Sequence, residues 1–267
     1  MHHAVERMMK PYYPQRVAAI VTVTAMVGLA GMFDAKVAAE GGEPATGLIE
    51  RVLAQTTRAG VAIRAIREMR AGTSNGKHRG WMEVETVVNP QQGFSWKVLD
   101  EGGSERTRNR IFRELLETEA ASWRDGTQDG AALTTANYQF EPLPTAPDGK
   151  VVIRLKPRRS DAKLIAGTLT VSADGYPLCL EGTLAKSPSF WVKSVAIVKR
   201  YGRFAGVALP TTIESLADVK MFGQSTLTMR YRYSEVNGRS IPDTIASAPS
   251  FGPSAEILKI HAAGYQR

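Results

Sequence analysis

The sequence predicts an α+β fold made mainly of antiparallel β-sheet, and three observations support this prediction. Much of the chain consists of short runs in which apolar and polar residues alternate, separated by short turns. Strands joined so closely pair antiparallel. Asp-Gly occurs at two of these turns, where glycine accepts the positive φ of a tight hairpin. Two other stretches carry apolar residues at helical spacing instead.

The first 39 residues are expected to be a signal peptide. Arg7, Lys10 and Arg16 precede an uncharged, apolar stretch at residues 17–33. Val37-Ala38-Ala39 then supplies the small residues that signal peptidase recognises. We therefore expect cleavage after Ala39 and a periplasmic or otherwise exported mature protein. The alternative is an uncleaved anchor, although 17 uncharged residues fall just short of the roughly 20 that span a bilayer.

The composition of the mature chain limits its chemistry and its partners. Cys179 is the single cysteine, so no internal disulfide forms, and we expect a buried, inert side chain there. The sequence has no cysteine near the end of the apolar stretch that could be modified with a lipid. Removing four basic and two acidic residues with the signal peptide lowers the net charge from +8 to +6. That excess favours contact with anionic surfaces, including lipid headgroups.

We expect the remaining chain to form one domain. Residues 40–45 contain Gly and Pro and are predicted to be a linker, and residues 46–240 are predicted to be a single domain. Residues 241–267 show little periodicity and are predicted to be an extended tail. The oligomeric state stays open.

The first half of this domain mixes helix and strand. Apolar residues at helical spacing predict a helix over residues 46–58. Apolar and polar residues alternate over residues 61–70, which predicts a strand, although a continuation of the preceding helix would fit these residues equally well. Residues 80–88 and 94–98 alternate on either side of a turn at residues 89–93, which predicts a hairpin.

A second helix is predicted after Gly102-Gly103-Ser104, with Ser104 as its cap. Arg110 with Glu114, and Arg113 with Glu117, are four residues apart on its wetter side. Such pairs explain the arginines without an anionic ligand. The opposite face of this helix is apolar apart from one glutamate. It carries Ile111, Phe112, Leu115, Leu116 and Glu119.

The second half is predicted to be a succession of antiparallel strands, because its turns are short. The predicted strands are residues 137–143, 151–156, 163–172, 176–185, 191–201, 207–220 and 224–236.

Catalytic motifs are missing from the sequence. The mature chain holds two histidines, His78 and His261, far apart in sequence, so we predict no metal site, no cofactor and no catalytic residue. The best enzymatic hypothesis is a carboxylate pair of Glu83 and Glu85 on one strand face, in a cleft. Such a pair more often lies on a solvated face.

Two further segments invite functional interpretation. The Ser and Lys residues of 186–193 do not have the Ser-x-x-Lys spacing of a nucleophile. We expect a turn at Ser187-Pro188, with Phe190 and Trp191 anchoring the next strand to the core or to a groove. Arg230 and Arg232 alternate with two tyrosines in the ordinary two-faced pattern of a strand, and we predict no nucleic-acid partner.

Several stretches together resemble an uncharacterised family of exported bacterial proteins related in fold to the LolA/LolB-type carriers that sort outer-membrane lipoproteins. This resemblance implies a LolA-like fold, in which a curved sheet or incomplete β-barrel has helices covering its concave side and an apolar cavity between. It implies no catalytic residues. The matching pieces are GWMEV (80–84), VLDEGGSE (98–105), LLETE (115–119), NYQF (137–140), LKPRR (155–159), EGTLAKSPSFW (181–191) and the stretch from Tyr201 to Leu209-Pro210.

The leading hypothesis is therefore a non-enzymatic periplasmic protein that binds a lipid, a lipid-modified protein or another apolar ligand between sheet and helix. The same residues in a closed core would look identical in sequence. The alternative function is a structural or protein-interaction module of the cell envelope without a ligand cavity. The residues predicted to line the ligand site are Phe94, Trp96, Val98, Ile111, Leu115 and Leu116.

Overall fold

The computed structural model describes residues 43–56, 60–76, 78–144, 150–220, 223–242 and 252–264. The predicted signal peptide, residues 1–39, lies outside the described residues. Among the described helices, none has the length and apolar character needed to cross a membrane.

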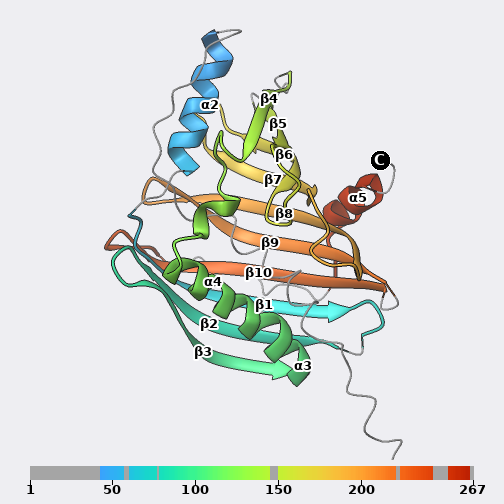
Figure 1. Cartoon of the computed structure of the whole chain (residues 1–267). Coiled ribbons are helices and arrows are strands. Elements are labelled where there is room, and N and C mark those ends of the chain that lie inside the picture. Colours follow the sequence, from blue (N-terminus) through green and yellow to red (C-terminus); the bar gives the residue numbers. More distant parts are fainter. Residues whose placement is uncertain are drawn as a thin grey trace, which may run out of the picture.

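A single antiparallel sheet of 11 strands forms the body of the protein (Figure 1). Its order is β3-β2-β1-β10-β9-β8-β7-β6-β5-β4, and β11 pairs with the end of β10. The sheet is not closed, because β3 and β4 end the order without pairing with each other. The strands are β1 (Ile63–Thr73), β2 (Gly80–Asn89), β3 (Gly93–Gly103), β4 (Tyr138–Pro142), β5 (Val151–Pro157), β6 (Ile165–Val171), β7 (Pro177–Leu184), β8 (Val192–Phe204), β9 (Val207–Val219), β10 (Gly223–Val236) and β11 (Arg239–Ser240).

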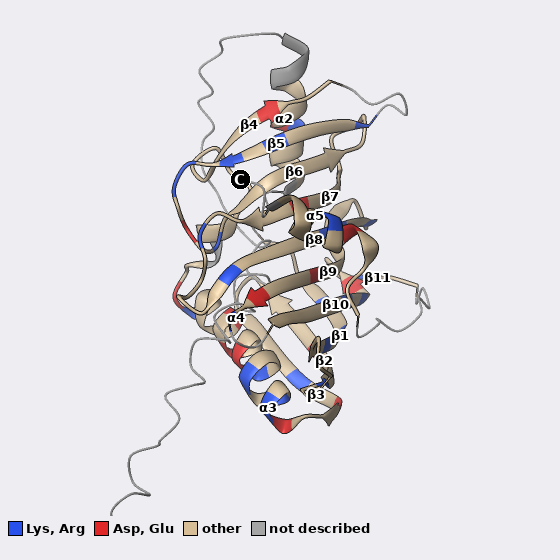
Figure 2. Cartoon of the chain, turned by 90° about the vertical axis from the view of Figure 1, so that its right-hand side faces the viewer, with Lys and Arg blue, Asp and Glu red and all other residues tan. Residues whose placement is uncertain are grey.

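The helices lie on both faces of this sheet. Figure 2 shows α4 and α5 on opposite sides of it. Helix α2 and the segment from α3 to α4 contribute to apolar clusters on one face, whereas α5 contributes to a cluster on the other. The helices are α2 (Glu43–Thr56), α3 (Glu105–Thr107), the π-helical turn η1 (Arg108–Arg113), α4 (Glu114–Arg124), the 3-10 turn η2 (Gln128–Ala131) and α5 (Ala255–Gly264).

The predicted fold class is confirmed: the protein is α+β, with a curved antiparallel sheet that stays open, and α2 and α4 cover one face of it. Helix α5 lies on the other face, which the resemblance did not imply. Every predicted strand is present, and of residues 61–70, which suited either structure, residues 63–70 belong to β1. Alternation explains this outcome, because every second residue from Ile63 to Met69 is buried. The short β11 is the strand that the pattern missed.

Two predictions about the ends of the chain differ from the structure. Helix α2 begins at Glu43, inside the expected linker, because Pro44 is tolerated in the first turn of a helix. The expected extended tail contains α5. Ser254 Oγ accepts a hydrogen bond from the Ile257 N–H (3.4 Å), and Ile257 is buried against Ala196, Val198 and Leu216 of the sheet. A surrounding run of Pro, Gly and Ser hid this short apolar pattern.

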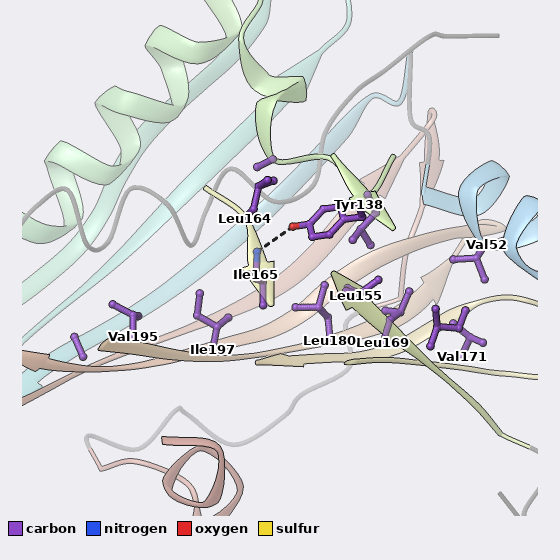
Figure 3. Packing of buried hydrophobic residues seen from close by; sticks show 14 of the residues in the cluster. Val52, Tyr138, Leu155, Leu164, Ile165, Leu169, Val171, Leu180, Val195 and Ile197 are labelled. Atoms are coloured by element: carbon purple, nitrogen blue, oxygen red, sulfur yellow. Dashed lines mark hydrogen bonds between the residues drawn. The ribbon is translucent and has the colours of Figure 1, made fainter. Parts of the chain in front are cut away.

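The face that carries α2 and α4 has two separate apolar clusters. The first lies between α2, the segment before β4 and strands β4 to β9. Tyr138 is at its centre and accepts a hydrogen bond from the Ile165 N–H through its hydroxyl (3.0 Å), as Figure 3 shows. The second cluster lies between η1, α4 and strands β1, β2, β3, β9 and β10. The sheet therefore offers two covered apolar surfaces on the same side.

Candidate ligand-binding site

All six residues predicted to line a ligand site belong to the second cluster, between η1, α4 and the sheet. Leu115 and Leu116 of α4 are fully buried, and Phe94 is 8% exposed. Trp96, Val98 and Ile111 are partly buried and pack against the same cluster. The structure therefore brings these residues together, with a closed centre and a partly exposed rim.

Sheet register explains why the three β3 residues share a face. Phe94 lies opposite Val88, Trp96 opposite Thr86 and Val98 opposite Val84, and the three β2 partners are buried. Alternate residues of a strand point to the same side. The apolar residues of β3 thus continue the buried face of β2 to the sheet edge, beneath the helix.

A buried ion pair joins the sheet to α4 within this cluster. Both guanidinium nitrogens Nη1 and Nη2 of Arg67 donate to the Glu119 carboxylate, at 2.5 and 2.9 Å. The two side chains are only 5% and 6% exposed. Burial works against the charge of Arg67, but Glu119 and the neighbouring tyrosines Tyr231 and Tyr233 together outweigh it, so the pKa of Arg67 is raised further and the guanidinium stays charged. Arg67 is fixed by β1 and Glu119 by α4, so the pair sets the position of the helix.

Two aromatic rings complete the surroundings of Arg67. Its guanidinium carbon lies 5.0 Å from the centre of the Phe94 ring and 5.1 Å from that of Tyr231. Burial raises the pKa of the Tyr231 hydroxyl to about 12. Cation–π contacts of this kind favour a retained positive charge. The site is thus apolar with one permanently charged, paired group.

Sequence reasoning did not identify Arg67, although a signal was present. Arg67 occupies a buried position of the alternation that begins with Ile63 and Ala65. Glu119 follows Leu115 by four residues on the apolar helix face. Opposite charges on two faces that must pack together indicate an ion pair, because a buried charge needs a partner.

A second polar contact holds the start of the helix to β3. Glu101 accepts hydrogen bonds from Arg108 (2.8 Å) and Arg113 (2.9 Å). The Arg113 hydrogen bond is the main reason why the pKa of Glu101 is lowered from its usual value. Arg113 had been expected to pair with Glu117 along the helix. Arg113 instead pairs with Glu101 of β3, and residue spacing within one helix does not reveal a contact with a strand.

The predicted cap is confirmed at the same junction. Ser104 Oγ accepts from the Thr107 N–H, and Thr107 Oγ1 donates to the carbonyl of His78 (3.0 Å). Gly103 has a φ of +77°, which glycine adopts without strain. The chain thus turns from β3 into the helix at a defined point.

Lys199 is a further buried cation on the face that carries the two clusters. It is 1% exposed, and its ammonium lies 5.3 Å from the Tyr201 ring centre. Its cross-strand neighbours on β7 and β9 are Leu180 and Ile213, members of the first and the second cluster respectively. A lysine therefore lies between the two apolar surfaces.

The carboxylates of the enzymatic hypothesis are in ion pairs on the strands. Glu85 accepts from Arg64 at 2.9 Å, and Glu83 lies 3.5 Å from Arg232. Arg232 also contacts Glu68 at 2.9 Å. The residues lie on the face opposite α4, because the buried residues of β2 alternate with them. This arrangement fits a solvated face and does not form the predicted cleft.

Cys179 is half-buried, in contrast to the buried position expected for it. Its thiol, with Glu181 and Glu256, brings three potential metal ligands within 4.8 Å of one another. Arg200 occupies this group, because it forms an ion pair with Glu256 and its Nη1 lies 3.9 Å from the Cys179 sulfur. Burial raises the pKa of the thiol. A guanidinium therefore supplies a positive charge next to Glu256 and the thiol.

Two solved structures match this chain, both at low sequence identity and low TM-score. A LolA superfamily protein from Nitrosomonas europaea matches with a TM-score of 0.36 and 13% identity, covering 74% of this chain and 94% of that one. A DUF1329 family protein from Desulfovibrio piger matches with a TM-score of 0.31 and 9% identity, covering 71% of this chain and 92% of that one. No family model matches the sequence, and no curated protein matches it.

The first structure bears the name of the fold, LolA-like, that the sequence resemblance implies. Both TM-scores are below 0.5, so neither likeness carries an argument about ligand or mechanism.

Proposed function

We propose that this protein is an exported, non-enzymatic binding protein for a lipid, a lipoprotein acyl chain or another apolar ligand. The ligand would lie between β1 to β3 and the η1–α4 helix, where the six predicted lining residues gather. Alkyl chains suit this layer, because each buried CH₂ contributes about 0.8 kcal/mol.

The observation that carries this proposal is the way the helix is attached. A helix with an apolar face covers an apolar sheet surface, while two polar contacts fix it: Arg67 with Glu119, and Glu101 with two arginines. The rim residues remain partly exposed: Trp96 and Val98 on the edge strand β3, and Ile111 on η1. An acyl chain entering at this rim would replace contacts between side chains with contacts to itself.

Native mass spectrometry tests the proposal directly. The full chain is produced with its export signal, purified without detergent and examined for bound acyl lipid. We expect a stoichiometric ligand in the wild type and its loss in Trp96→Glu or Ile111→Glu, because a carboxylate in the rim disfavours burial of an alkyl chain. These half-exposed positions are preferred to Leu115, whose full burial would make a charge unfold the helix.

Ser95→Glu provides the matched control, because Ser95 is exposed on the other face of the same strand. It should keep the ligand. If the wild type has the mass of the bare chain, and takes up neither added phospholipid nor acylated peptide, the proposal is wrong.

The alternative, an envelope interaction module, is favoured by one observation. Phe112, Leu115 and Leu116 are 0% exposed, as in a closed core. A bare wild-type mass together with a specific protein partner would support that function instead.

A further inference from the structure

The loop between β7 and β8 displays two aromatic side chains to solvent. Phe190 and Trp191 had been predicted to anchor β8 to the core or to a groove, but the structure shows otherwise. Phe190 is 71% exposed and Trp191 is 39% exposed. Their rings contact each other edge to face, with centres 5.6 Å apart. Other large hydrophobic residues exposed among the described residues, Leu99 and Leu258, lie apart in sequence on different elements.

Hydrogen bonds hold this loop in one shape. Ser187 Oγ donates to the Lys193 carbonyl (2.9 Å), so the serine of the Ser/Lys segment has a structural role. The Val192 N–H donates to the Ser189 carbonyl (3.1 Å) and the Lys220 N–H to the Trp191 carbonyl (2.8 Å). The aromatic pair is therefore presented from a fixed hairpin beside the end of β9.

Lysines surround the aromatic pair. Lys186 and Lys193 are exposed, and the ammonium of Lys220 lies 3.7 Å from the centre of the Phe190 ring. Asp218, 3.8 Å from the Lys193 ammonium, is the acidic partner in this group. No Asp or Glu occurs in the sequence between Glu181 and Glu214. The loop thus combines exposed aromatic rings with a local excess of positive charge.

The neighbouring turn adds to this charge. The Ala185 N–H donates to the Leu164 carbonyl (2.8 Å), which places the turn between β5 and β6 beside the loop. That turn carries Arg158, Arg159 and Lys163 with one acid, Asp161. The aromatic pair therefore lies beside a second basic turn.

We infer that the loop of residues 186–193, with Lys220, is a contact site for an anionic lipid bilayer surface. Tryptophan is enriched at membrane–water interfaces because its ring is apolar and its N–H is polar. Lysines at the same depth are attracted to anionic headgroups. An aromatic pair flanked by cations on a rigid hairpin matches both properties of that surface. The inference goes beyond the proposed ligand site and holds whether or not the cluster beneath α4 takes a ligand.

Vesicle flotation tests the inference with the full exported chain. Vesicles of phosphatidylcholine alone are compared with vesicles that also contain phosphatidylglycerol. We expect the wild type to float with the anionic vesicles, less so as salt is raised. The double variant Phe190→Ser, Trp191→Ser should lose binding by about tenfold or more, since it removes the interfacial rings. The double variant Lys186→Glu, Lys193→Glu should lose its preference for the anionic vesicles.

Leu258→Ser is the matched control, because Leu258 is an exposed hydrophobic residue (42%) on α5, which is not part of the loop. It should float like the wild type, and all variants should keep the wild-type melting temperature. The inference is overturned if the wild type does not float with anionic vesicles or floats equally with neutral ones. It is also overturned if the aromatic double variant floats as well as the wild type, or if the basic surface instead retains an acidic protein and no vesicle.

Discussion

Arg67 and Glu119 give the clearest test of a single contact. A charge left buried without its partner is costly, so Glu119→Gln should lower the free energy of unfolding by about 3–5 kcal/mol. Replacing both residues with apolar ones, Arg67→Met with Glu119→Leu, should recover most of that loss, because no buried charge remains. Urea unfolding followed by circular dichroism measures both.

The exposed pair Arg64–Glu85 is the matched control on the same strand, with side chains 48% and 35% exposed. Glu85→Gln there should cost about 0–1 kcal/mol. Equal losses for Glu119→Gln and Glu85→Gln would contradict the view that burial makes the Arg67 pair decisive.

The contacts of single side chains are what the sequence predicts least well. The six predicted lining residues do gather in one cluster, because alternation and helical spacing report which face is apolar. The same patterns do not report where a partner lies. Arg113 contacts Glu101 on a strand, and Phe190 points to solvent although its type favours burial. These outcomes depend on which elements meet, which no local spacing contains.

Among the elements, the junction between β3 and α3 sets where the helix starts. A Cβ at Gly103 would lie 2.4 Å from the Arg79 carbonyl oxygen, in addition to the strain of its positive φ. We expect Gly103→Ala to lower the free energy of unfolding by more than the roughly 1–2 kcal/mol that a left-handed conformation costs by itself. Thermal unfolding by calorimetry measures the effect.

Gly60 separates the two contributions. Its φ is +87°, and nothing lies within 4 Å of a Cβ built there. Gly60→Ala should therefore show the conformational cost alone. If Gly103→Ala proves no more destabilising than Gly60→Ala, the strand and helix ends have room to separate, and the junction is looser than described.

The predicted helix is confirmed where a capping residue precedes a clear apolar periodicity. The prediction is wrong for α5, where that periodicity is weak. The helix after Ser104 has a capping serine and a long apolar face, and it was predicted. Helix α5 has ten residues within a stretch rich in Pro and Ser, and its one fully buried apolar residue, Ile257, gives little periodic signal. Its helical state follows from contact with the sheet, since short helices depend on such packing.

For the whole molecule, stability should fall at both ends of the pH scale. At the acid end, Glu101, Glu141, Asp161 and Asp174 have pKa values lowered by hydrogen bonds and nearby positive charges. The unfolded chain binds these protons first. The stabilisation is therefore present above the ordinary carboxyl pKa of about 4 and is lost as pH falls through the lowered values.

At the alkaline end, burial raises the pKa of Tyr138 to about 12. The unfolded chain releases this proton near pH 10, so folding stability should fall as pH rises from about 10 to 12. Tyr138→Phe should make this alkaline loss shallower. At neutral pH the variant should be less stable by about 1–3 kcal/mol, because the Ile165 N–H loses its acceptor. Urea midpoints across this pH range measure both effects, and an unchanged alkaline slope in Tyr138→Phe would contradict the assignment.

The open sheet has a consequence for self-association. Strands β3 and β4 end the sheet order, and a strand edge with free backbone groups is a template for pairing with another molecule. On the β3 edge, buried Phe94 and partly buried Trp96 alternate with exposed Ser95 and Lys97, and β4 ends in Glu141 and Pro142. A charged side chain on one edge and a proline on the other oppose edge-to-edge polymerisation. The two edges that leave the sheet open thus carry residues that discourage pairing with further copies of the chain.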